Sequence, residues 1–276
     1  MSDDPSRTPR PMDYELPQID TSVAHSARVY DYILGGKDNY PLDRAAAERM
    51  LESWPSLRIS MQENRRFMHR AVRYIAEQGV DQFLDIGTGI PTSPNLHEIV
   101  QEVTPGARVV YVDKDPIVLA HAGARLTSTP QGRTAYIHAD MNDPQAVLRA
   151  PELAATLDFG RPVGLSMIAV LQFVLDDEQA YGLVRQYLDL LPSGSYLAIS
   201  TVTTDSSPKP AGTVVAEYAR RGIPARNRTK AEVEPFFDGL QLVDPGVVLV
   251  HNWRPVPGSD VLDTDVAMYG GVALKP

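Results

Sequence analysis

The pattern of apolar and polar positions divides the chain into a helical first part and an alternating strand–helix second part. Apolar side chains recur at helical spacing in residues 22–34, and Gly35-Gly36 follows as a stop signal. Two further helices are predicted at residues 43–52 and 59–78, with Gly79 after the second. The first 80 residues are therefore predicted to be helical.

Beyond Gly79, short runs of apolar residues replace the helical period. Five of them are predicted to be buried strands: residues 82–86, 108–112, 134–138, 162–170 and 195–200. Helices between them are expected to start at Ser93-Pro94, Asp115-Pro116 and Asp143-Pro144, where proline follows a capping residue. Strands that alternate with helices predict a parallel sheet.

The C-terminal part has a different pattern. Thr229 and Glu232 form a capping box that predicts the start of a helix. Two apolar runs, 247–250 and 266–273, follow with a Pro/Gly-rich turn between them, and such strands should pair antiparallel. We therefore expect an α/β, Rossmann-like fold with a mostly parallel seven-stranded sheet that ends in an antiparallel hairpin. The expected divisions are a disordered leader (1–18), an N-terminal helical cap (19–79) and a doubly wound domain (80–276).

Composition narrows the functional classes. The 276 residues include 26 Lys+Arg and 35 Asp+Glu, giving a net charge of −9, which makes a nucleic-acid partner unlikely. The absence of cysteine excludes disulfides, Cys-ligated zinc, iron–sulfur clusters and cysteine nucleophiles. No apolar run suffices for a membrane span, and the N-terminus does not resemble a secretory signal. We expect a cytoplasmic protein without a membrane contact.

A glycine turn carries the sharpest chemical signal. Asp85 ends the first predicted strand, and Gly87-Thr88-Gly89 follows, where glycine permits a tight turn and close approach of the backbone to a ligand. A second acid, Asp113, ends the next strand 24 positions after Gly89, where acids in such folds bind ribose hydroxyls. Asp140 and Met141 follow the third strand at the same expected edge. For Asp115 and Asp143, which directly precede proline, helix capping is the favoured role.

The turn favours a nucleoside ligand without a phosphate. Thr92 stands where a dinucleotide fingerprint requires a third glycine, and Pro91 removes a backbone N–H. S-adenosylmethionine (SAM) is such a ligand. Its ribose is then expected at Asp113, its adenine near Asp140 and Met141, and its methionine part over Gly87 and Gly89.

Several stretches resemble the bacterial S-adenosyl methyltransferase family, formerly a domain of unknown function. The resemblance covers most of residues 20–276 and is most specific in Tyr-Asp-Tyr-Ile-Leu-Gly-Gly-Lys-Asp-Asn (30–39) and Phe-Leu-Asp-Ile-Gly-Thr-Gly-Ile-Pro-Thr (83–92). A third matching stretch, residues 110–116, contains Asp113 and Lys114. The resemblance implies the class I methyltransferase fold and SAM binding, with no agreed substrate. One departure is Gln172, because the family has Leu-His-Phe where this chain has Leu171-Gln172-Phe173, and glutamine cannot serve as a general base.

Other residues have two possible roles. Tyr30, Lys37 and Asn39 could form a lid that clamps the methionine end of the cofactor, or a helix stop with solvated charges. Asn64 shares an apolar helix face and needs a partner, so it is a further candidate cofactor contact. The arginines of that helix, Arg65 included, are interpreted as a solvated face. The catalytic residue is left open.

The candidates for the catalytic residue are Gln172, His25 and His69. No histidine spacing predicts a metal site. The function favoured by the sequence is a SAM-dependent methyltransferase whose small-molecule acceptor enters between the N-terminal helices and the fourth and fifth strands, near Met167 and Ile168. Two alternatives are a SAM-binding regulatory protein with weak or no catalysis and an NAD-dependent oxidoreductase. The acceptor atom and the oligomeric state cannot be read from the sequence.

Overall fold

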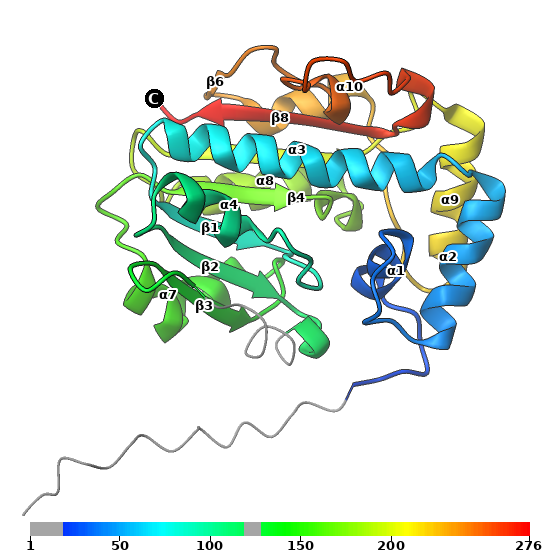
Figure 1. Cartoon of the computed structure of the whole chain (residues 1–276), viewed down its shortest axis with the longest axis horizontal. Helices are drawn as coiled ribbons and strands as arrows, with labels where there is room; N and C mark the ends of the chain where they lie inside the picture. Colours follow the sequence, from blue (N-terminus) through cyan, green and yellow to red (C-terminus); the bar gives the residue numbers. More distant parts are fainter. Residues whose placement is uncertain (1–18, 119–127) are drawn as a thin grey trace, which may run out of the picture.

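The computed structural model in Figure 1 describes residues 19–118 and 128–276, so the leader predicted at 1–18 lies outside the described residues. The N-terminal part is helical, as predicted. Its helices are α1 (Ser26–Ile33), α2 (Pro41–Ser53) and α3 (Leu57–Glu77). None of the described helices is long and apolar enough to cross a membrane.

Within the described residues, the sheet has eight strands in the order β3-β2-β1-β4-β5-β8-β6, and β7 also pairs with β8. The strands are β1 (Gln82–Ile86), β2 (Arg108–Asp113), β3 (Arg133–His138), β4 (Gly164–Ile168), β5 (Tyr196–Val202), β6 (Gln241–Leu242), β7 (Val248–Leu249) and β8 (Met268–Leu274). The first five are parallel, and β8 pairs antiparallel with β5, β6 and β7. The Rossmann-like fold class is thus confirmed. The seven predicted strands did not include β6. This strand has only two residues, both exposed, so it gives no apolar run in the sequence.

The remaining helices follow the strands along the chain. They are α4 (Leu96–Val103), α6 (Pro144–Arg149), α7 (Pro151–Thr156), α8 (Asp177–Leu188), α9 (Pro208–Arg220) and α10 (Lys230–Val233), with short 3₁₀ turns at Leu171–Phe173, Glu234–Phe237, Val250–Asn252 and Asp263–Asp265. Asp143 caps α6 and Thr229 opens α10 with its capping box, as predicted. The start predicted at Ser93-Pro94 is wrong, because Asn95 and Glu98 form the capping box of α4.

Helix α3 lies along one face of the sheet (Figure 1), where it packs against β4, β5 and β8. Phe67 of this helix meets the fully buried ring of Trp253 edge-on, with ring centroids 5.6 Å apart. A single apolar cluster joins buried residues of α1, α2, α3 and this face of the sheet. The helices predicted as an N-terminal cap therefore share an apolar core with the sheet.

Helices α1, α2 and α9 stand opposite the carboxyl ends of the parallel strands (Figure 1). Helix α2 packs against both α1 and α9. Parallel α/β sheets bind ligands at the carboxyl ends of their strands. The three helices thus cover the edge at which a ligand is expected.

Candidate functional site

A cavity of about 660 Å³ lies between the carboxyl ends of the strands and the helices α1, α3 and α9. Ten of the twelve predicted cofactor-binding residues line it. They are Tyr30, Asn64, Asp85, Gly87, Thr88, Gly89, Asp113, Lys114, Asp140 and Met141. Residues more than 100 positions apart in the sequence therefore meet at one site.

The glycine turn after β1 forms one wall of the cavity. Gly87 and Gly89 have φ angles of +71° and +68°, a conformation that glycine adopts without strain. A Cβ atom on Gly87 would lie 2.2 Å from Cγ1 of Val170, so a side chain there has no room. The N–H groups of Gly87 and Thr88 donate to the carbonyl oxygen of Val112, at 2.8 and 3.2 Å. The turn is thus fastened to β2.

Asp113 ends β2 beside this turn. Its Oδ2 accepts a hydrogen bond from the N–H of Gly89 at 2.8 Å, and its Oδ1 accepts one from the N–H of Asp115 at 2.9 Å. Burial raises the pKa of Asp113 and outweighs these two hydrogen bonds. Each carboxylate oxygen has a further lone pair for a ligand in the cavity. This geometry fits the predicted role of Asp113 toward ribose hydroxyls.

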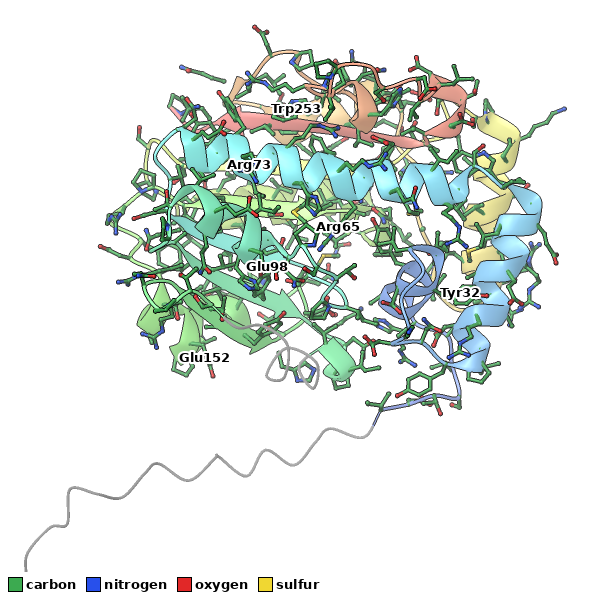
Figure 2. The ribbon with its side chains drawn as sticks, viewed as in Figure 1. Tyr32, Arg65, Arg73, Glu98, Glu152 and Trp253 are labelled. Carbon is green, nitrogen blue, oxygen red and sulfur yellow. The ribbon has the colours of Figure 1, made fainter. Side chains whose placement is uncertain are left out.

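Buried Asp85 and half-buried Arg65 carry opposite charges at the cavity wall. Burial raises the pKa of Asp85 to about 6, although the charge of Arg65 and nearby hydroxyls oppose the shift. Arg65 donates from Nη2 to the carbonyl oxygens of Thr92 and Pro94, whereas its Nε is buried without a hydrogen-bond partner. Burial also lowers the pKa of Arg65. Figure 2 shows Arg65 reaching from α3 toward the strand ends.

Arg65 was missed by the sequence reasoning, which placed it on a solvated face. The signal was present, because the cavity-lining residues of α3 follow a helical stripe that includes Arg65. They are Leu57, Ser60, Met61, Asn64, Arg65 and Met68. A single cation on a stripe whose other residues are apolar or neutral indicates an anionic partner.

Lys114, Asp140 and Met141 line the adjoining part of the cavity. Nζ of Lys114 lies 3.4 Å from Oδ2 of Asp140, and both side chains are partly exposed. Oδ1 of Asp140 accepts from the backbone and side-chain N–H groups of Asn142, both at 2.9 Å. This part of the cavity is polar at Lys114 and Asp140 and apolar at Met141. It therefore suits a purine, whose edge is polar and whose faces are apolar.

A chain of hydrogen bonds crosses from α1 to the sheet. The hydroxyl of Ser200 donates to Oδ1 of Asn64 at 2.6 Å, and Nδ2 of Asn64 donates to the hydroxyl of Tyr30 at 3.1 Å. The Tyr30 hydroxyl in turn donates to the carbonyl oxygen of Met61 at 3.1 Å. Burial raises the pKa of Tyr30, so its hydroxyl stays protonated. Asn64 thus has the partners that its place on an apolar face requires.

The loop after α1 does not supply the predicted clamp. Lys37 is exposed, and neither Lys37 nor Asn39 lines the cavity. Nδ2 of Asn39 donates to Oδ2 of Asp31 at 2.7 Å and to the carbonyl oxygen of Gly36 at 3.1 Å. A Cβ on Gly36 would overlap the Asp31 carboxylate. The loop is therefore folded around Asp31, and this structural role accounts for its polar pattern.

The three catalytic candidates have different positions. Gln172 lines the cavity, donates from Nε2 to the carbonyl oxygen of Ala169 at 2.6 Å, and has a buried Oε1 without a partner. His25 also lines the cavity, but its Nδ1 lies 2.9 Å from Oδ2 of Asp115. His69 does not line it, and its Nε2 lies 3.1 Å from the carbonyl oxygen of Pro94. Burial lowers the pKa of His69 to about 4.

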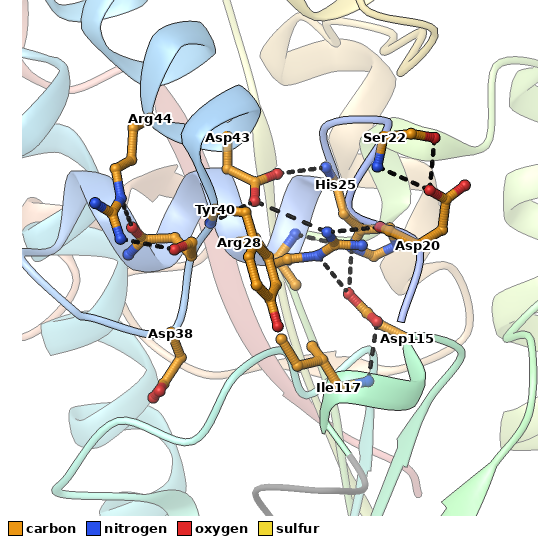
Figure 3. Close-up of polar contacts among 12 residues, drawn as sticks. Asp20, Ser22, His25, Arg28, Asp38, Tyr40, Asp43, Arg44, Asp115 and Ile117 are labelled. Carbon is orange, nitrogen blue, oxygen red and sulfur yellow. Dashed lines mark hydrogen bonds and ion pairs between the residues drawn. The ribbon is translucent and has the colours of Figure 1, made fainter. Parts of the chain in front are cut away.

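Buried charges fasten α1 to the end of β2 (Figure 3). Nε of Arg28 lies 3.3 Å from Oδ2 of Asp115, and its Nη1 lies 3.8 Å from Oδ2 of Asp43. These three side chains are almost fully buried. Asp115 Oδ1 also accepts from the N–H of Ile117 at 3.0 Å, in agreement with its predicted capping role.

The described residues contain no group of three or more His, Cys, Asp or Glu able to hold a metal ion. The acids, glycines and hydroxyls of the cavity instead fit a nucleoside. A family model described as S-adenosyl methyltransferase matches residues 12–276. The chain belongs to this family. It is accordingly a SAM-dependent methyltransferase, and the family assignment does not support the alternative of an NAD-dependent oxidoreductase.

Two solved structures are similar over nearly the whole chain. A DUF574 family protein from Streptomyces avermitilis is 57% identical with a TM-score of 0.92, and the match covers 94% of this chain and all of the other. A protein from Thermobifida fusca, described provisionally as a methyltransferase, is 37% identical with a TM-score of 0.87, covering 95% and 99% of the two chains. No protein of curated function matches the chain.

Proposed function

We propose that the cavity binds SAM across the ends of β1, β2 and β3 and transfers its methyl group to a small-molecule acceptor. The observation that carries this proposal is the convergence of Asp113, the Gly87–Gly89 turn and Arg65 on one cavity. Asp113 would hold the ribose, and Asp140 with Met141 would border the adenine. The guanidinium of Arg65 is suited to the methionine carboxylate, because its Nε has no partner within the described protein.

When bound, the cofactor supplies a sulfonium methyl group whose carbon is attacked by a lone pair of the acceptor, while the S–CH₃ bonding pair returns to sulfur and S-adenosylhomocysteine results. The residues of this chain bind and orient the two reactants. Positioning can contribute about 7–11 kcal/mol to such a displacement. Gln172 cannot remove a proton. The contact between Nδ1 of His25 and Asp115 does not prevent Nε2 of His25 from accepting one, because a carboxylate at Nδ1 orients and supports a histidine base.

Calorimetric titration of the full chain with S-adenosylhomocysteine tests the assignment of the cofactor residues. Asp113→Ala removes charged hydrogen bonds of about 1.5–3 kcal/mol, so affinity should fall about 10- to 100-fold. Arg65→Leu should cause a loss of similar size. Lys37→Ala is the matched control, because Lys37 is exposed and outside the cavity. Equal affinities for Asp113→Ala and Lys37→Ala would refute the assignment.

Release of S-adenosylhomocysteine in the presence of a candidate acceptor separates an enzyme from a SAM-binding regulatory protein. The wild type should form this product only when SAM and an acceptor are both present, and the Asp113→Ala variant should lose the activity. Tight SAM binding without turnover across a broad panel of small-molecule acceptors would favour the regulatory alternative.

A further inference from the structure

One part of the cavity, beneath α9, is apolar. We call this part the apolar chamber and define it by Trp54, Leu57, Met61, Val214, Tyr218 and Met268. Each of these side chains is less than a tenth exposed, and all belong to one apolar cluster. Pockets with such walls bind ligands mainly by removing apolar ligand surface from water.

Charged side chains at the cavity are concentrated in the cofactor part. Among the described lining residues outside it, the charged ones are Asp31 and Arg221. Asp31 accepts hydrogen bonds from the N–H of Asp38 and from Asn39, and Arg221 donates from Nε to Glu217 at 3.1 Å. Both side chains are therefore engaged within the protein, with Glu217 shared between Arg221, Arg49 and Arg220, and neither belongs to the six residues that define the chamber. A charged ligand in the chamber would lose its hydration without gaining an opposite charge.

Gln172 adds one directed polar group between the glycine turn and the chamber. Its Nε2 donates to the carbonyl oxygen of Ala169, which fixes the amide so that Oε1 is the free end. Its backbone carbonyl accepts from the N–H of Arg226 at 2.8 Å, so the residue is held at both ends. Oε1 is buried and unpartnered, and such an acceptor requires a donor from a ligand or water.

We propose that the apolar chamber binds a neutral, ring-sized methyl acceptor that donates an N–H or O–H to Oε1 of Gln172. This inference rests on the proposed function, because it assigns the chamber to the acceptor and the rest of the cavity to SAM. The chamber selects for a neutral apolar body. Gln172 selects for one protic group and places it beside Val170, which packs on the glycine turn. Glutamine, in place of the family's histidine at position 172, thus serves to bind the acceptor.

Three naphthalene probes test the inference by calorimetry, with the full chain saturated with S-adenosylhomocysteine. We expect 2-naphthol, which is neutral and protic at pH 7, to bind at least about tenfold more tightly than the anion 2-naphthoate. The probe 2-methoxynaphthalene keeps the rings but lacks the donor. In Gln172→Leu, affinity for 2-naphthol should fall about three- to tenfold, as for the loss of one hydrogen bond. Affinity for 2-methoxynaphthalene and for S-adenosylhomocysteine should not change.

Ala211→Phe fills the chamber from α9, since Ala211 is buried and lines the cavity. It should abolish 2-naphthol binding and retain S-adenosylhomocysteine binding. If wild type binds S-adenosylhomocysteine but none of the probes, or binds 2-naphthoate as tightly as 2-naphthol, the inference is overturned. It is also overturned if Gln172→Leu weakens S-adenosylhomocysteine, because Oε1 then serves the cofactor. Failure of wild type to bind S-adenosylhomocysteine would instead overturn the proposed function.

Discussion

Asp85 should make the free protein less stable as the pH rises. Its pKa is raised from 3.8 to about 6 by burial, so the folded state retains its proton over a range in which the unfolded state has lost it. Stability therefore falls as the pH rises from about 4 to about 6 and is then constant with respect to this group. At 1.36 kcal/mol per pKa unit, the loss is about 3 kcal/mol. The variant Asp85→Asn lacks this titration and should gain that amount relative to wild type between pH 4 and pH 7.

Urea unfolding at pH 4 and pH 7 measures the difference in unfolding free energy between Asp85→Asn and wild type. Asp238→Asn is the control for net charge, because it removes the same charge from an exposed turn. A difference between Asp85→Asn and wild type that is the same at both pH values would refute the reasoning. S-adenosylhomocysteine affinity gives a second readout. If Asp85 faces the cationic part of the cofactor, the Asp85→Asn variant is more stable yet binds the ligand more weakly, as expected when a site is strained for function.

Two further substitutions test the packing that supports the site. Gly87→Ala should destabilise the fold by about 1–3 kcal/mol in urea unfolding, because the added Cβ overlaps Val170. It should also abolish S-adenosylhomocysteine binding, as measured by calorimetry. Adding Val170→Ala to the same chain should restore part of the stability. Arg28→Leu removes the buried cation that lies between the carboxylates of Asp43 and Asp115 and should cost about 3–5 kcal/mol in urea unfolding. The control is Arg161→Leu, which breaks an exposed ion pair and should lower the unfolding free energy by only about 0–1 kcal/mol. Equal losses of unfolding free energy in Arg28→Leu and Arg161→Leu would contradict the argument.

The sequence predicted the parts of the fold that rest on local pattern. All five parallel strands overlap their predicted ranges, because each is an apolar run bounded by polar residues. Gly87, Gly89 and Asp113 were found because their spacing reflects one strand–turn–helix unit. The site positions that the sequence misjudged depend on contacts formed only in the folded protein. The polar loop after α1 suggested a clamp that includes Lys37 and Asn39, but Asn39 of this loop donates a hydrogen bond to Asp31 of α1.

The part of the cavity wall that α9 forms could not be predicted for a related reason. Helix α9 has its own start and stop signals, Pro208 at its first turn and Gly222 after its end, yet nothing local places it against α2. Trp54 and Tyr218 are separated by 164 positions and meet only in the folded cavity. An amphipathic stripe shows that a helix has an apolar face, but it does not show whether that face meets a core or a ligand.

Helix α1 connects the two halves of the site. Arg28 joins it to Asp115, and the N–H of Asp115 donates to the same carboxylate of Asp113 that is expected to meet the ribose. Two residues further along α1, Tyr30 lines the cavity and is tied through Asn64 to the sheet. A displacement of α1 would therefore disturb the cofactor residues and the acceptor chamber together. Since Gln172 offers no proton transfer, the rate of the reaction depends on how well these contacts hold the two reactants in line. The buried charges around Arg28 are suited to this task, because moving them apart would expose unpaired charge to an apolar interior.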